Sequence, residues 1–383
     1  MKRLIVPTAA CGFAIACALV ALSCARRADA RTEQETCLTD VLQLTSGFDR
    51  AGEAYFSADM KWVIFQATSP GGQHYHMYVA RLVYEGDAIR GIEAPIRISP
   101  DDSRNTCGYF APDNASLIFA STAGKDDPNQ PEPGFDRGGR NYRWSYPPGM
   151  EIYRADHWQD AIKGVAPGGS INLARHALTD NNAYDAECAF SPDGKWIVFT
   201  SNRAGDPTPP PATQPQPDPA AANKDLELYA MRADGSNVVR LTNAPGYDGG
   251  PFFAPDGKRL VYRSDRKNNN LLQVFVADLV FDGSGNITGL ANERQLTDDA
   301  NVNWGPYWHP DGGHIIYATS AHGHTNYELY LMRGDGSQTT RITYAAGADV
   351  LPVFSPDGKY LIWASKRNGQ STQIYVARFT MPR

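Results

Sequence analysis

The sequence predicts an all-β fold, a six-bladed β-propeller with four antiparallel strands in each blade. Three observations lead to this prediction. A strand–turn–strand pattern, clearest in YDAECAFSPDGKWIVFTSNR from Tyr184 to Arg203, occurs six times along the chain. An aromatic residue marks a third strand behind each copy, and a fourth strand usually follows. Four short strands repeated about every 45 residues, plus insertions, are the signature of propeller blades.

Each copy is built around a tight turn. In Ser191-Pro192-Asp193-Gly194, proline presets φ, aspartate can bond its own backbone and glycine accepts a positive φ. We therefore expect a structural role for the six aspartates at this position. These turn aspartates are Asp59, Asp113, Asp193, Asp256, Asp311 and Asp357. The third-strand aromatic residues are Tyr78, Tyr153, Tyr229, Phe275, Tyr330 and Tyr375. Six copies in register argue against a sandwich of unrelated hairpins.

Residues 1–30 are predicted to be a secretory signal peptide. Lys2-Arg3 precedes a mostly apolar stretch from Leu4 to Ser23, and Ala28-Asp29-Ala30 fits a cleavage site for soluble export. Leu22-Ser23-Cys24 resembles a bacterial lipobox, with cleavage before Cys24 and a lipid on that cysteine. An uncleaved anchor is the third alternative, because the stretch approaches spanning length. All three place the propeller outside the cytoplasm.

The mature chain is predicted to contain a short linker, residues 31–37, and the propeller, residues 38–383. The full sequence has a net charge of −6, which offers no electrostatic reason to bind nucleic acid. Of the cysteines, Cys37, Cys107 and Cys188 follow the signal. Cys107 lies six residues before its turn aspartate and Cys188 five, so strand alternation would point them to opposite faces. We expect buried, free thiols.

The ring is predicted to close through a strand from the N-terminus. The last blade has three strands before Arg383, and an open edge would expose unpaired backbone groups. Val41 to Thr45, VLQLT, matches the fourth-strand pattern VVRLT at Val238 and can complete that blade. The alternative is a tail behind the signal. Insertions at 124–150 and 204–224 separate the second and third strands of blades two and three, and the second insertion is Pro-rich.

The connections of a four-stranded meander alternate between two faces. The Pro-Asp-Gly turns and the turns between strands three and four share one face, here the turn face. The beginnings of the inner strands and both insertions share the other, the top face. Polar residues at these beginnings predict a partner-binding rim, with Glu53 just inside the channel. The rim residues are Asp49, Asn105, Asp185, Glu187, Asp248, Asn303, Trp304 and Asp349. Capping of the strand ends is the alternative interpretation.

The sequence contains none of the common catalytic motifs. GxSxG, HExxH and GxxxxGK[ST] are absent, so we expect no catalytic residue and no cofactor. The pairs His74/His76 and His322/His324 are weak candidates for metal ligands, since HxH can bind metal. They fall in blades that are not neighbours, and His76 shares its column with Glu and Gln of other blades. We therefore predict no metal site.

The repeats resemble those of the TolB family, especially from Leu178 to Thr242, and the resemblance covers about Leu38 to Phe379. It implies a periplasmic, non-enzymatic six-bladed propeller that binds an envelope protein or peptide, such as the lipoprotein Pal, at its channel mouth. TolB also has an α/β domain before its propeller, for which this sequence has no room between the signal and Leu38. A Pal or TolA partnership is therefore not carried over.

The resemblance leads to a first hypothesis of an exported protein-binding scaffold in the bacterial cell envelope. We expect a monomer with a protein or peptide partner, no nucleic-acid partner and membrane attachment only through a lipid on Cys24. The alternative is a metal-dependent enzyme, because oligogalacturonate lyases resemble this chain in length and propeller type and use a histidine-bound metal. A passive surface protein is the third interpretation.

Overall fold

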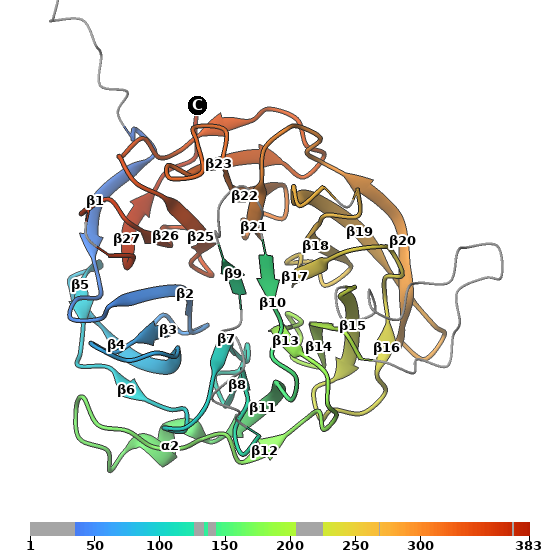
Figure 1. Cartoon of the computed structure of the whole chain (residues 1–383). Helices are drawn as coiled ribbons and strands as arrows, with labels where there is room; N and C mark the ends of the chain where they lie inside the picture. The colour runs from blue at the N-terminus through green and yellow to red at the C-terminus, as the bar shows by residue number, and fades with distance from the viewer. Residues whose placement is uncertain (1–34, 126–133, 137–142, 204–224, 268, 370) are drawn as a thin grey trace, which may run out of the picture. The chain divides into compact units, whose positions relative to one another are not determined.

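The computed structural model describes residues 35–125, 134–136, 143–203, 225–267, 269–369 and 371–383. Thr36–Arg383 forms one compact unit of six four-stranded antiparallel blades around a central axis (Figure 1). The predicted fold class is confirmed. The predicted signal peptide, residues 1–30, and the whole Pro-rich insertion, residues 204–224, lie outside the described residues. Within the described part of the chain, no helix is long and apolar enough to cross a membrane.

The blades repeat one order of strands from the axis outward. The innermost strands are β2 (Arg50–Phe56), β7 (Asn105–Phe110), β13 (Asp185–Phe190), β17 (Asp248–Phe253), β21 (Asn303–Trp308) and β25 (Asp349–Phe354). The second strands are β3 (Trp62–Thr68), β8 (Ser116–Ser121), β14 (Trp196–Ser201), β18 (Arg259–Ser264), β22 (His314–Thr319) and β26 (Tyr360–Ser365).

The outer two strands of each blade complete this pattern. The third strands are β4 (His76–Glu85), β11 (Glu151–Asp156), β15 (Glu227–Arg232), β19 (Gln273–Phe281), β23 (Glu328–Arg333) and β27 (Gln373–Phe379). The fourth strands are β6 (Ile96–Arg97), β12 (His176–Ala177), β16 (Val239–Arg240), β20 (Ile287–Gln295), β24 (Thr340–Arg341) and β1 (Leu38–Gln43).

The N-terminal strand closes the ring, as predicted, by pairing β1 antiparallel with β27 of the sixth blade. Its bounds differ from the predicted segment, Val41 to Thr45: the strand begins at Leu38 and ends at Gln43. Thr45 lies beyond the strand but still fixes it: its Oγ1 donates to Gln373 Oε1 at 2.8 Å and accepts from the Ile374 amide at 2.9 Å.

Three additions to the blades were not predicted. Blade one carries an extra strand, β5 (Ala88–Ile92), paired with the long β4. Blade two carries a short helix, α2 (Trp158–Ile162), before its fourth strand. Its insertion contains a hairpin of β9 (Gly134–Asp136) and β10 (Arg143–Ser145), which Figure 1 shows over the centre of the ring.

The third-strand aromatic residues are partners of aromatic residues on the second strands. The pairs face each other in register in all six blades: Phe65 with Tyr78, Phe119 with Tyr153, Phe199 with Tyr229, Tyr262 with Phe275, Tyr317 with Tyr330, and Trp363 with Tyr375. Ring centroids lie 5.6 Å apart in the Phe199–Tyr229 pair. Such pairs contribute about 0.5–1.5 kcal/mol beyond burial of their surface.

The turn aspartates all bond the backbone of their own turns. In each blade the carboxylate accepts from the amide two residues later, as Asp193 Oδ1 does from Lys195 at 3.1 Å. Ser191 adds two further hydrogen bonds to this turn, since its Oγ donates to Asp193 and accepts from the Trp196 amide. Gly194 has φ +70°, the left-handed conformation that this turn requires.

Candidate functional site

A bulge in every innermost strand shapes the central channel. The pairing of each innermost strand with its neighbour shifts register at the same place, and the residue six positions before the turn aspartate has a positive φ. These bulge residues are Glu53, Cys107, Glu187, Gly250, Gly305 and Leu351. A non-glycine residue in this conformation costs roughly 1–2 kcal/mol. Strain of this kind at four positions around one channel marks it as a candidate site.

Four aromatic rings meet on the axis and form a plug across the channel. They come from one repeat column, two residues after the bulge, in blades one, two, four and five: Tyr55, Tyr109, Phe252 and Tyr307. The Tyr55 and Tyr109 ring centroids lie 5.0 Å apart, and those of Phe252 and Tyr307 lie 4.9 Å apart. The Tyr109 and Tyr307 hydroxyls hydrogen-bond at 3.0 Å. The plug separates a chamber on the top side from a funnel on the turn side.

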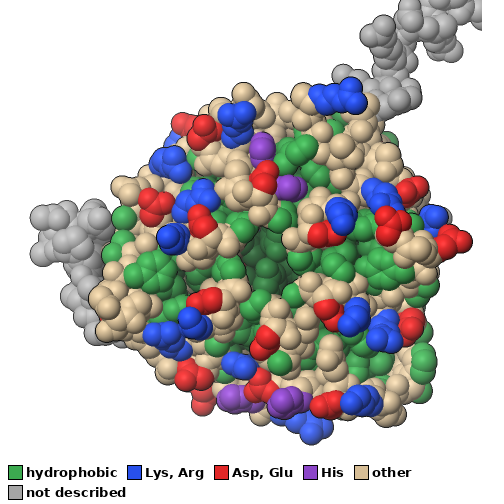
Figure 2. Space-filling view, turned by 180° about the vertical axis from the view of Figure 1, so that it is seen from behind, with side chains coloured by type: hydrophobic (Ala, Val, Ile, Leu, Met, Phe, Trp, Pro, Cys, Tyr) green, Lys and Arg blue, Asp and Glu red, His purple; other side chains and the backbone are tan. Residues whose placement is uncertain are grey.

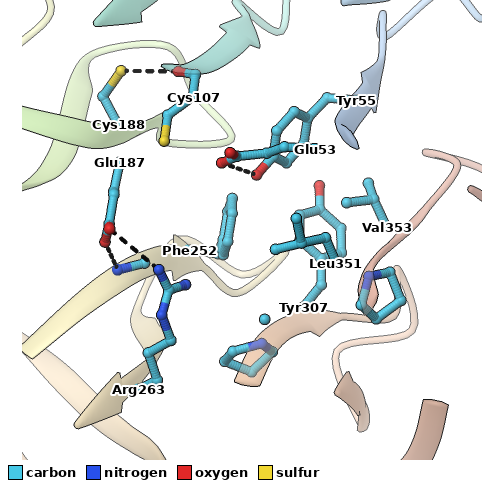
Figure 3. A pocket seen from close by; sticks show the side chains of 14 residues that line it. Glu53, Tyr55, Cys107, Glu187, Cys188, Phe252, Arg263, Tyr307, Leu351 and Val353 are labelled. Carbon is cyan, nitrogen blue, oxygen red and sulfur yellow. Dashed lines mark hydrogen bonds and ion pairs between the residues drawn. The ribbon is translucent and has the colours of Figure 1, made fainter. Parts of the chain in front are cut away.

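The chamber above the plug is small and charged (Figure 3). Its volume of about 20 Å³ is enough for one water molecule. Glu187 lies on its wall and accepts from the Tyr247 hydroxyl and the Gly250 amide, both at 2.6 Å. Arg263 Nη2 lies 3.2 Å from Glu187 Oε1, and the two side chains are only 8% and 10% exposed.

Gly250 makes room for this ion pair. A Cβ there would lie 1.9 Å from Arg263 Nη1, so any side chain would displace the guanidinium. Arg263 Nε is buried without a hydrogen-bond partner. The absence of a side chain at Gly250 therefore leaves the space in which the Arg263 guanidinium reaches Glu187.

Glu53 faces the same chamber from blade one. Burial raises the pKa of its carboxyl, and the Glu187 charge adds to this effect, while Cys107 and Arg263 oppose it. The chamber thus holds one ion pair and a second acid with a raised pKa. Glu53 and Glu187 both border the channel interior, where the sequence places them.

Cys107 and Cys188 also line the chamber, while Cys37 is buried elsewhere; all three are free. The predicted free, buried thiols are thus found in the structure. The expectation that Cys107 and Cys188 point to opposite faces is wrong, because the bulge interrupts the alternation. Cys188 Sγ lies 3.5 Å from the Cys107 carbonyl oxygen. Burial raises the pKa of both thiols, which disfavours the reactive thiolate.

Most rim residues lie inside the protein at the beginnings of their strands. Asn105, Asp185, Asp248, Asn303 and Asp349 are at most 1% exposed. An arginine from the loop after the second strand binds each of the three aspartates at 2.8–2.9 Å: Arg203 with Asp185, Arg266 with Asp248, and Arg367 with Asp349. These ion pairs hold the three carboxylates inside the protein.

The remaining rim residues differ. Asp49 is exposed and accepts from the Gly71 amide at 2.8 Å. Trp304 is half-buried and lies near Arg263, 6.0 Å from ring centroid to guanidinium carbon. Glu187 belongs to the chamber. The structure thus brings Glu187 and Trp304 together around Arg263 and leaves Asp49 apart. A partner contact at this rim stays a prediction.

Glutamates of two third strands form a second set of buried pairs. Glu227 binds Arg240 at 2.8 Å and Glu328 binds Arg341 at 2.9 Å, and each also accepts from a threonine two residues beyond the fourth strand, Thr242 or Thr343. Burial raises the pKa of both carboxyls to about 7, against the opposing effect of the threonine and arginine.

Burial of three glutamates with raised pKa values is expected to reduce stability as pH rises from about 4.5, the ordinary pKa of glutamate, to about 7. A carboxyl with a raised pKa binds its proton more tightly in the folded state, so its contribution is full below the unfolded pKa and is lost as pH rises through the folded one. Glu53, Glu227 and Glu328 all act in this direction. Melting temperatures at constant ionic strength test it. Glu53→Gln, which resembles the protonated acid, should flatten the profile, and a melting temperature that increases with pH would refute the prediction.

On the turn side of the plug, the channel widens into an apolar funnel. Figure 2 shows this hollow, with hydrophobic side chains at its centre and acidic and basic groups interspersed around it. Its volume is about 330 Å³, and residues of all six blades line it. An aromatic column forms the wall: Phe56, Phe110, Phe190, Phe253, Trp308 and Phe354. The turn prolines and one alanine surround the opening: Ala58, Pro112, Pro192, Pro255, Pro310 and Pro356.

The weak histidine candidates lie in ordinary polar surroundings. His76 Nδ1 is 3.1 Å from Ser99 Oγ, and His322 Nε2 is 2.7 Å from the Tyr330 hydroxyl. The His324 ring packs near Tyr327, with centroids 6.3 Å apart. Among the residues that the structure describes, no three His, Cys, Asp or Glu side chains are grouped to hold a metal ion.

The plug, the role of Arg263 and the funnel were not predicted from the sequence. The plug had a visible signal, since an aromatic residue recurs at one repeat position in four blades. The funnel residues were assigned to turns and strands rather than to a shared surface. Arg263 is the one charged residue at a second-strand position where the other blades have Gln66, Ala120, Thr200, Ala318 and Ala364. Its contact with Glu187 of the neighbouring blade could not be predicted from that position alone.

Fold and site together define a class: a six-bladed β-propeller whose channel is plugged and opens on one face as an apolar funnel. The sequence model of the TolB β-propeller domain family matches residues 286–381. Proteins described as TolB homologues in Chlorobium luteolum and Chlorobium chlorochromatii are each 30% identical, over 184 and 215 residues. The chain is thus a TolB-like six-bladed β-propeller.

The matches to the two TolB homologues cover only part of each sequence. They cover 48% and 53% of this chain but only 34% and 41% of the two relatives. The structure of a protein assigned as TolB from Agrobacterium tumefaciens has 18% identity and a TM-score of 0.51, covering 86% of this chain and 91% of that one, and shows the fold alone. The structure of an oligogalacturonate lyase in complex with manganese is more distant, at 11% identity and a TM-score of 0.46.

Proposed function

We propose that this protein is an exported, non-enzymatic scaffold that binds a protein partner in the bacterial cell envelope through its funnel. The observation that carries the proposal is the funnel itself. It is open and apolar, and equivalent residues from six blades build it. A hollow of about 330 Å³ suits an apolar side chain or loop tip of a partner rather than water.

The top face offers less open surface. Five of its rim residues are buried in contacts within the protein, and the chamber beneath holds about 20 Å³. The β9–β10 hairpin lies over this mouth (Figure 1). We therefore place the contact on the turn face and keep the top rim as a separate prediction.

Export is supported by the pattern of Lys2 to Ala30 and by the resemblance to TolB, a periplasmic protein. TolB-like relatives favour a protein partner over other ligand classes. Among the described residues, His76 contacts Ser99 and His322 contacts Tyr330, so neither contact favours the lyase alternative.

Site-specific photocrosslinking in the native host tests the proposal. A photoreactive residue at exposed Ala58, beside the funnel, is expected to form an adduct with one discrete envelope protein. Pro356→Glu on the same rim should abolish that adduct by placing a charge in an apolar contact. Exposed Ala166, in a loop outside the funnel, is the matched control position. Equal adducts at Ala58 and Ala166 would reject the proposal, and an adduct only at Asp49 would move the site to the top rim.

A further inference from the structure

A groove between blades three and four extends the funnel outward along the turn face. Its volume is about 400 Å³. It shares Ser191, Pro192, Phe253 and Pro255 with the funnel, so the two hollows are continuous. Buried Trp196 and Ile287 lie along it, and Phe281, 41% exposed, stands at its outer part. The groove therefore offers an extended chain segment an open path outward from the funnel.

The groove carries a lysine whose charge no carboxylate neutralises. Lysine follows the turn aspartate by two residues in four blades. In three of them it pairs with that aspartate at 3.2–3.3 Å, as Lys61, Lys195 and Lys359 do. In blade four, Arg259 binds Asp256 at 2.8 Å instead. Lys258 is exposed and forms no ion pair with any residue that the structure describes.

Arg232 adds a second cation to the groove. Its guanidinium lies over the Trp196 ring, 4.3 Å from the centroid, and donates to the side-chain oxygen of Asn286. The Arg232 charge helps to lower the pKa of the nearby Asp234 and Asp282 carboxyls. Their hydrogen bonds, however, are within their own turns: Asp234 bonds Ser236, and Asp282 bonds Ser284 and Asn286. An arginine bonded to a neutral amide retains its attraction for an anion.

We propose that the groove binds an extended acidic segment of the partner whose apolar residue occupies the funnel. The proposal rests on the proposed function and adds the partner's chemistry: an aromatic or aliphatic anchor with aspartate or glutamate a few residues away. The apolar walls, the exposed Lys258 and the guanidinium of Arg232 favour that occupant. The net charge of −6 would favour a basic partner if the carboxylates of the top face were free to bind it. Arginines of the protein itself already bind three of these carboxylates, so the net charge does not argue against an acidic segment on the turn face.

Selection from a random library of 12-residue peptides, displayed on their encoding RNA, tests this proposal. The expected winners carry an apolar anchor and at least one acidic residue, and their affinity decreases with salt. Lys258→Glu should weaken a winning synthetic peptide at least about tenfold, or roughly 1.4 kcal/mol. Lys359→Glu makes the same charge change at the equivalent position of blade six and should have little effect. Both lysines are exposed, so both variants should fold.

Other outcomes separate the two proposals. Peptides that lose binding with Ala58→Glu but not with Lys258→Glu would overturn the groove and leave the funnel intact. Basic winners, or equal losses for Lys258→Glu and Lys359→Glu, would overturn the acidic segment. A dimer of the protein that Lys258→Glu dissociates would also overturn it, because the occupant would be a second copy. Crosslinking at Ala58 decides the funnel independently of all these results.

Discussion

Deleting β1, Leu38–Gln43, is expected to open the ring and leave the protein insoluble or melting at least about 10 °C lower. The strand covers the outer edge of β27 and buries Leu38 there, at 6% exposure. Its loss would leave the backbone groups along the outer edge of β27 unpaired, which invites pairing with another chain. Heating monitored by circular dichroism and sedimentation of the soluble fraction measure the effect.

A point variant separates strand pairing from mere truncation. Thr45→Val removes two buried hydrogen bonds to Gln373 and Ile374 while keeping the volume, and should lower stability by about 1–3 kcal/mol. Val41→Glu, at a side chain 40% exposed on the same strand, should change little. A deletion variant that melts like the intact protein would mean that β1 does not hold the ring closed.

Replacing Arg263 by methionine is expected to cost about 3–5 kcal/mol of unfolding free energy. The substitution removes the cation beside Glu187 and leaves a buried carboxylate facing the acid of Glu53. Methionine keeps most of the apolar volume, so the loss reports the charge rather than a cavity. Urea unfolding at pH 7 measures it.

Two further variants test the cause. Glu187→Gln combined with Arg263→Met removes both charges and should recover part of the loss. Arg90→Met breaks the Arg90–Glu85 pair, whose side chains are 51% and 77% exposed, and should cost less than about 1 kcal/mol. If Arg263→Met cost no more than Arg90→Met, the chamber pair would not be the buried charge pair that the geometry indicates.

The buried arginine pairs show how little a residue's type says about its role. Asp185 and Asp349 share a column with other polar residues, a pattern that fits either a binding rim or capped strand ends. What distinguishes the alternatives is burial and the approach of Arg203 and Arg367, ten residues after the turn aspartate. Sequence spacing places these arginines in the loop but does not fix where their side chains reach.

The sequence by itself determined the blade count, the turns, the aromatic residues of the third strands and the closing strand. These features depend on local rules: alternation along a strand, the backbone preferences of proline and glycine, and the need to pair a free edge. Only the tertiary structure decided the site. A bulge turned Cys107 and Cys188 into the same chamber, Arg263 reached Glu187 from the next blade, and six separate turns met to make one funnel. Such contacts join residues far apart in the chain, and their geometry exists only once the ring has closed.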